Sequence, residues 1–168
     1  NENTQRLYFI KDRQVQEERS KIEKLKNIEL NRQKKELEAA RLFQINLLPT
    51  EMPKTMNYDI SAYIKTADEV GGDYYDFFYS NNDNTTTAVL GDATGHGMVA
   101  GNIVSITKSA LNSLNIDDNI DQILLKLNNT IRNIEIGRNR MSLTILRLNN
   151  DNFEIASSAM PTIFYYKR

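Results

Sequence analysis

The chain has 168 residues, enough for one domain and an additional segment. A net charge of −1 gives no global attraction to nucleic acid or to an anionic membrane, and we expect no nucleic-acid partner. The absence of cysteine excludes disulfides and thiolate chemistry, and no apolar run approaches the roughly 20 residues that cross a bilayer. We therefore expect a cytoplasmic protein. Because the chain begins with Asn1 rather than Met, we expect it to be part of a longer one, which an upstream region could tether to a membrane.

Residues 1–47 are predicted to form one long helix. They contain no Gly or Pro and are rich in Glu, Lys, Arg, Gln and Leu. Apolar residues follow a seven-residue repeat whose register slips by one position between Ile22 and Leu30. The apolar residues of this stripe are Tyr8, Val15, Ile22, Leu25, Leu30, Leu37, Ala40 and Leu47. A stripe this narrow predicts a coiled-coil homodimer, the alternative being a single solvated helix.

Pro49 and Pro53 end this helix, because proline cannot continue it. Residues 48–168 alternate between strand-like and helical patterns, with strands, two helices and then further strands, which favours an α+β domain built on antiparallel sheet. Asp117 or Asp118 is the expected cap of the second helix. Strands are predicted at 58–64, 74–80, 85–91, 140–148, 153–159 and 162–168, and helices at 97–114 and 119–134.

Two short stretches place an aspartate directly after a glycine beside an apolar run. They are "VGGDYYDFF", which contains Asp73, and "LGDATGHGM", which contains Asp92. Two carboxylates that meet across neighbouring strands repel each other unless they are protonated or bridged by a cation. Hard divalent cations such as Mg²⁺ or Mn²⁺ prefer such oxygen ligands, and paired metal ions suit the hydrolysis of phosphate esters. The alternative is that one or both aspartates only cap turns.

The other polar residues of this region carry less chemistry. Asp68, Asp76 and Asp83 fit turn or surface positions. His96 is the single histidine, and it lies in the glycine-flanked "GHG" corner without an obvious triad partner. A solvent-facing or loop-stabilising role is at least as strong an expectation for it as a catalytic one. No cluster of zinc-type ligands is present in the sequence.

Taken in order, four blocks of the sequence resemble the SpoIIE/RsbU branch of the PPM phosphatases, the bacterial relatives of protein phosphatase 2C. The blocks are "LEAARLFQINLLPTEMP", "VGGDYYDFF", "LGDATGHGMVAG" and "SSAMPTIFYYKR". The resemblance implies a PPM-type α-β-β-α sandwich of antiparallel sheets, with two Mn²⁺ or Mg²⁺ ions. It also implies hydrolysis of phosphoserine or phosphothreonine on a regulatory protein, typically a STAS-type anti-anti-sigma factor.

The same resemblance assigns the metal ligands by position. Asp73 matches the acidic ligand of the first block, Asp92 matches the aspartate that contacts both metals, and the backbone carbonyl of Ala93 completes the site. A metal-activated water, rather than a side chain, is then the nucleophile. His96 lies four residues after Asp92 and does not match the general-acid histidine of the animal enzymes, which follows its aspartate by two.

Two departures from the family pattern stand out. The later "TDG" or "SDG" block and a further acidic ligand do not occur in the sequence. The sandwich is therefore expected to be incomplete at the C-terminus, and the missing ligands leave open whether the 168-residue piece is active by itself. The usual "AGMPP" or "AGHPP" motif is replaced by "SAMPT", which lacks the glycine.

Phosphatase domains of this kind often follow a sensor domain through a coiled-coil linker. We therefore expect residues 1–47 to be a linker and dimerisation helix and residues 48–168 to be the phosphatase domain. The opening "NENTQRLYFI" resembles the last helix of a GAF sensor domain. The leading hypothesis is a metal-dependent protein serine/threonine phosphatase controlled through this helix; the alternatives are an inactive PPM-like binding module and a purely structural coiled-coil adaptor.

Overall fold

The computed structural model describes residues 2–55, 57–65, 70–80, 85–134, 137–149 and 152–166, with side chains from residue 11 onward. The elements are α1 (Glu2–Leu47), β1 (Asp73–Tyr79), β2 (Thr86–Ala93), α2 (Met98–Ser113), α3 (Ile120–Asn133), β3 (Met141–Leu148) and β4 (Phe153–Ser158). All three predicted helices and four of the predicted strands are thereby confirmed. No helix among the described residues is long and apolar enough to cross a membrane.

The chain divides into two compact units, Asn1–Ala39 and Ala40–Arg168. The first unit is the larger part of α1, along which Arg13 pairs with Glu17 and Arg32 pairs with Glu29. Residues of the predicted seven-residue stripe lie uncovered in the single chain: Val15, Ile22, Leu25 and Leu30 are between 43% and 66% exposed. A helix with an uncovered apolar stripe gains little from packing within its own chain.

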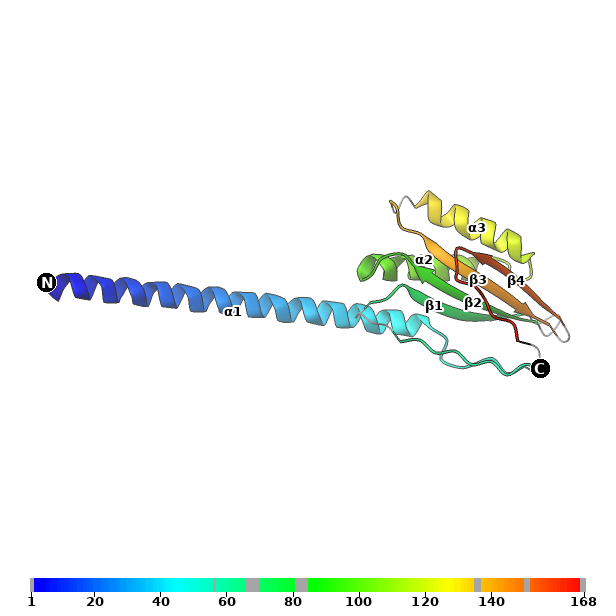
Figure 1. The fold of residues 1–168 in the computed structure, drawn as a ribbon, viewed down its shortest axis with the longest axis horizontal. Helices are drawn as coiled ribbons and strands as arrows, with labels where there is room; N and C mark the ends of the chain where they lie inside the picture. Colours follow the sequence, from blue (N-terminus) through cyan, green and yellow to red (C-terminus); the bar gives the residue numbers. More distant parts are fainter. Residues whose placement is uncertain are drawn as a thin grey trace. The chain divides into compact units, whose positions relative to one another are not determined.

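The second unit is built on one antiparallel sheet with the strand order β1-β2-β3-β4 (Figure 1). Each strand pairs with its neighbour in sequence, so the sheet is a meander interrupted by α2 and α3 between β2 and β3. Because side chains alternate along a strand, the register fixes which residues share a face. Tyr74, Val89 and Ile145 occupy the face that α2 and α3 cover, and all three are almost fully buried.

Helices α2 and α3 complete this core with apolar residues at helical spacing. Ile103, Val104 and Leu111 of α2 and Ile123 and Leu127 of α3 are at most 2% exposed and belong to the same cluster as the strand residues. The apolar residues that the sequence places at helical spacing in both segments are therefore the ones that pack against the sheet.

The cap of α3 differs from the prediction. The side chain of Asn119, rather than Asp117 or Asp118, accepts a hydrogen bond from the backbone N–H of Asp121. Asp118 instead pairs with Lys126 and accepts a hydrogen bond from Asn115. Asparagine and aspartate are about equally good caps. Asn119 is the cap because it directly precedes Ile120, the first residue of α3.

The strand predicted at 58–64 is not formed, and no strand is assigned at 161–166. A strand needs a neighbour for its backbone N–H and C=O groups, and none of the described residues pairs with either segment in a sheet. The face of the sheet opposite the helices carries Tyr79, Leu90, Phe153 and Ile155, which are 42% to 55% exposed. The predicted α+β class is confirmed, with one sheet of the expected sandwich present in the described residues.

Ala159, in the "SAMPT" motif, has a left-handed backbone conformation with a φ of 58°. No other non-glycine residue in the described part of the chain has a positive φ. Ala159 stands where the resembling family has glycine, and a side chain in this conformation costs about 1–2 kcal/mol. We expect Ala159→Gly to raise the free energy of unfolding by about 0.5–1 kcal/mol, because glycine removes this strain at some cost in entropy. Urea denaturation measures the change. Ala156→Gly, in the regular part of β4, is the matched control and should be destabilising; a loss of stability in both variants would contradict the prediction.

Candidate metal centre

Asp73 and Asp92 face each other across the first two strands. Asp73 is the first residue of β1, Asp92 is the last residue but one of β2, and the antiparallel register pairs them directly. Both lie on the side of the sheet that the helices do not cover, and both are exposed. The two Gly-Asp stretches, separated in sequence, therefore bring two carboxylates together at one end of the sheet.

The electrostatics of this pair favour a cation. Partial burial, and after it the neighbouring charge of Asp92, raise the pKa of the Asp73 carboxyl. Like charges directly opposite each other in a sheet are destabilising, and a divalent cation bound between them removes the repulsion. Carboxylate oxygens are also the ligand type that Mg²⁺ and Mn²⁺ prefer, so the donor set fits these ions.

The backbone of Ala93 lies against the residue before Asp73. The N–H of Ala93 donates to the carbonyl oxygen of Gly72 at 2.9 Å, and a Cβ atom on Gly72 would overlap the Ala93 carbonyl oxygen. Glycine at position 72 is thus required by the close approach of the two strands. The carbonyl expected to be a metal ligand is held beside the start of β1, next to Asp73.

The loop that leads into β1 is fixed by a residue that the sequence reasoning did not single out. Gln44 near the end of α1 is 7% exposed; its Oε1 accepts a hydrogen bond from the Gly71 N–H at 2.9 Å, and its Nε2 donates to the Gly71 carbonyl. The carbonyl of Val70 accepts from the Gly97 N–H at 3.1 Å. One feature of the sequence could have indicated this role. Gln44 is a polar residue on the same helical face as Ala40 and Leu47, where an apolar residue is expected.

Asp76 corrects the prediction of a turn or surface role. It is 5% exposed and lies on the helix side of β1, where its carboxylate accepts from the Lys108 ammonium at 2.7 Å and from the Tyr74 hydroxyl at 2.8 Å. Burial, and after it the Asp76 carboxylate, raise the pKa of Tyr74 above its ordinary value. Asp76 therefore ties β1 to α2 and does not face the Asp73–Asp92 pair. Asp68 and Asp83 lie outside the described residues.

The other described residues near the site add no further acidic or histidine side chain to the pair. His96 is exposed in the turn before α2, as expected for a solvent-facing residue. Within the described residues, no group of three or more His, Cys, Asp or Glu side chains could hold a metal ion. Asp73, Asp92 and the Ala93 carbonyl thus remain the predicted oxygen ligands in this part of the chain.

No family model matches the sequence. The chain is similar to the phosphoserine phosphatase RsbU of Bacillus subtilis (strain 168), with 29% identity over 141 residues that cover 80% of this chain and 41% of RsbU. It is also similar to Protein IcfG of Synechocystis sp., with 34% identity over 76 residues that cover 45% of this chain and 12% of IcfG. The chain thus spans less than half the length of either relative.

Among solved structures, the SiaA-PP2C domain of Pseudomonas aeruginosa matches with a TM-score of 0.53 and 16% identity over 71% of this chain and 50% of that domain's chain. The structural likeness shows that this chain has part of the fold of a PP2C-type domain. The resemblance of the sequence to the RsbU branch of the PPM phosphatases is confirmed by the similarity to RsbU itself.

Proposed function

We propose that this chain belongs to a metal-dependent protein serine/threonine phosphatase and supplies part of its metal centre. The observation that carries the proposal is the direct pairing of Asp73 with Asp92 at one end of the sheet. The similarity to an enzyme named as a phosphoserine phosphatase supports the reaction class. Asp73, Asp92 and the Ala93 carbonyl would hold Mn²⁺ or Mg²⁺, of which two ions are expected in the complete site.

The chain's own part in the reaction is to bind and orient. When bound, such ions lower the pKa of a coordinated water and neutralise charge on the phosphoryl oxygens. Asp73 and Asp92 provide the negative charge that retains the ions, and Gly72 allows the Ala93 carbonyl to approach. The hydrogen bonds of Gln44 to Gly71 hold the loop before Asp73, so that the carboxylate is presented from a fixed backbone.

The proposed substrate is phosphoserine or phosphothreonine on a regulatory protein, with a STAS-type anti-anti-sigma factor as the first candidate. The test is hydrolysis of p-nitrophenyl phosphate and of a phosphoserine protein by the whole protein, with and without Mn²⁺. We expect turnover that EDTA removes and Mn²⁺ restores. Stoichiometric binding of the phosphoprotein without turnover at any Mn²⁺ concentration would favour the inactive binding module instead.

We further propose that α1 dimerises the protein as a coiled coil and transmits a signal from an upstream sensor, such as a GAF domain, to the phosphatase unit. The exposed stripe on α1 supports this proposal, because pairing with a second copy would bury it. The slip between Ile22 and Leu30 would accommodate two packings of the pair.

Polar substitutions in this stripe should separate the dimer. We expect Leu25→Glu combined with Leu37→Glu to convert the protein to monomers, because charges would enter the buried seam of the coiled coil. Light scattering measures the molar mass. Lys24→Glu combined with Lys35→Glu, at exposed positions outside the stripe, is the control and should leave the dimer intact. Dimers that persist unchanged in the leucine variant would show that the seam lies elsewhere.

A further inference from the structure

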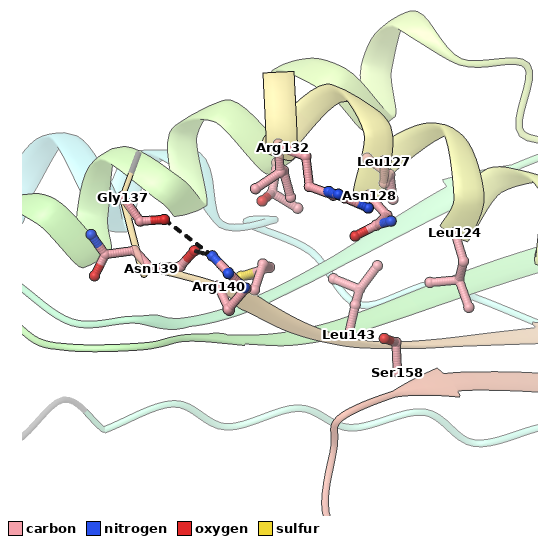
Figure 2. A pocket seen from close by; sticks show the side chains of 12 residues that line it. Leu124, Leu127, Asn128, Arg132, Gly137, Asn139, Arg140, Leu143 and Ser158 are labelled. Atoms are coloured by element: carbon pink, nitrogen blue, oxygen red, sulfur yellow. Dashed lines mark hydrogen bonds between the residues drawn. The ribbon is translucent and has the colours of Figure 1, made fainter. Parts of the chain in front are cut away.

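A cavity of about 400 Å³ lies between α3 and the beginning of β3, on the helix side of the sheet rather than on the face that carries Asp73 and Asp92. Figure 2 shows the residues that line it. Its volume falls within the range of about 300–1,000 Å³ that small-molecule sites occupy. One part of its wall is apolar: Leu124, Leu127 and Ile131 follow one another at helical spacing on α3, and Leu143 of β3 contributes from the sheet. An apolar group could therefore be buried in this part.

The rest of the wall is polar, and the charged side chains among its described residues are two arginines. Arg132 comes from the last turn of α3 and Arg140 from the residue before β3, and no Asp or Glu is among the described residues that line the cavity. Asn128 and Ser158 add an amide and a hydroxyl. Two guanidinium groups at one cavity, with no carboxylate among its described lining residues, favour an anion, to which arginine can donate two parallel hydrogen bonds.

The arginines are only partly used by the protein itself. Arg140 donates through Nη1 to the carbonyl oxygens of Gly137 at 3.2 Å and Asn139 at 2.8 Å, bonds that fix the side chain and leave its other nitrogens unbonded within the described part of the chain (Figure 2). Arg132 complements the C-terminal end of the α3 dipole, which accounts for a cation at this position but not for its place at a cavity.

The cavity adjoins the strand ends of the candidate metal centre from the helix side of the sheet. The backbone N–H of Arg140 donates to Thr94 Oγ1 at 2.8 Å, and the Arg140 carbonyl accepts from the Thr94 N–H at 2.9 Å. Met141 of the cavity wall is the register partner of Ala93. The positively charged end of the cavity is thus joined to the segment that directly follows Asp92.

We propose that this cavity is a binding site for a small amphipathic anion, in which Arg132 and Arg140 hold a carboxylate or phosphate group and the leucine-lined part holds an apolar body. The site is distinct from the metal centre and requires neither metal nor phosphatase activity. A ligand there would contact Arg140, whose backbone is hydrogen-bonded to Thr94.

The test is calorimetric titration of the whole protein with octanoate and with octyl phosphate, alongside octanol and inorganic phosphate. We expect at least one of the two amphipathic anions to bind at least about tenfold more tightly than octanol or phosphate, because charged hydrogen bonds and apolar burial both contribute. Whichever binds more tightly identifies the anionic group. NMR methyl shifts should appear at Leu127 and Leu143. Equal binding of octanol, or shifts confined to other residues, would overturn the proposal.

Matched arginine variants distinguish binding in this cavity from a general attraction of the anion to positive charge on the protein. Arg132→Gln and Arg140→Gln should each weaken binding of the preferred anion at least about tenfold. Arg138→Gln, an exposed arginine of the same loop that does not line the cavity, should leave binding unchanged. Arg132 is exposed in the last turn of α3, so its variant should remain folded even if Arg140→Gln does not. Equal effects of Arg132→Gln and Arg138→Gln would contradict the assignment.

Discussion

Asp92→Asn is expected to abolish the Mn²⁺-dependent hydrolysis of phosphate esters by the whole protein. The substitution keeps the shape of the side chain but removes one of the two facing negative charges. Loss of an anionic ligand removes several kcal/mol of charge stabilisation, so we expect a decrease in kcat/KM of about a thousandfold or more. Asp73→Asn should act in the same direction. The measurement is the rate of p-nitrophenyl phosphate hydrolysis across a series of Mn²⁺ concentrations.

Two controls distinguish loss of metal from loss of structure. Mn²⁺ should raise the melting temperature of the unmodified protein but not that of Asp92→Asn, because only binding to the folded state stabilises it. Asp59→Asn, at an exposed position away from the pair, should leave both activity and the Mn²⁺ effect unchanged. Full activity of Asp92→Asn would show that the phosphatase site lies elsewhere.

The same variant tests the electrostatic coupling of the two carboxylates. Burial is the larger cause of the raised pKa of Asp73, and the charge of Asp92 is the second. In metal-free Asp92→Asn the pKa of Asp73 should therefore fall toward its ordinary value without reaching it. Carboxyl NMR titration measures this change. An unaltered pKa would mean that the two groups do not interact despite their register.

Asp76→Ala is expected to destabilise the second unit strongly. It leaves the Lys108 ammonium, whose side chain is 24% exposed, without its carboxylate, and the buried Tyr74 hydroxyl without its acceptor. The Phe77 N–H also loses its partner at 2.9 Å. Because Lys108 retains some contact with water, we expect a cost of about 2–4 kcal/mol in the free energy of unfolding, below that of a fully buried pair.

Urea denaturation of two further variants tests whether the Lys108 ion pair causes this loss of stability. Asp76→Ala combined with Lys108→Met should recover part of the stability, because the unpaired charge is removed. Asp118→Ala, which breaks the exposed pair with Lys126, should have little effect, because solvent screens that pair. If Asp76→Ala proves as mild as Asp118→Ala, the Lys108 ion pair is not a significant part of the core.

The sequence alone determined the three helices and four of the strands. Heptad spacing predicted α1, and the helical period of 98–113 and 120–133 predicted α2 and α3, because these patterns depend only on the geometry of the helix. The Gly-Asp stretches predicted two carboxylates at strand ends. The strand predicted at 58–64 failed, because alternation indicates a strand only where a neighbouring strand accepts its hydrogen bonds.

Only the tertiary structure decided which side of each strand faces the helices. Asp73 and Asp76 lie three residues apart, so they point to opposite faces; the register with β2 and the packing of α2 placed the first in solvent and the second against Lys108. The bonds of Gln44 to Gly71 and of Arg140 to Thr94 join residues far apart in sequence. Local patterns specify local geometry, whereas such contacts exist only once the helices have packed on the sheet.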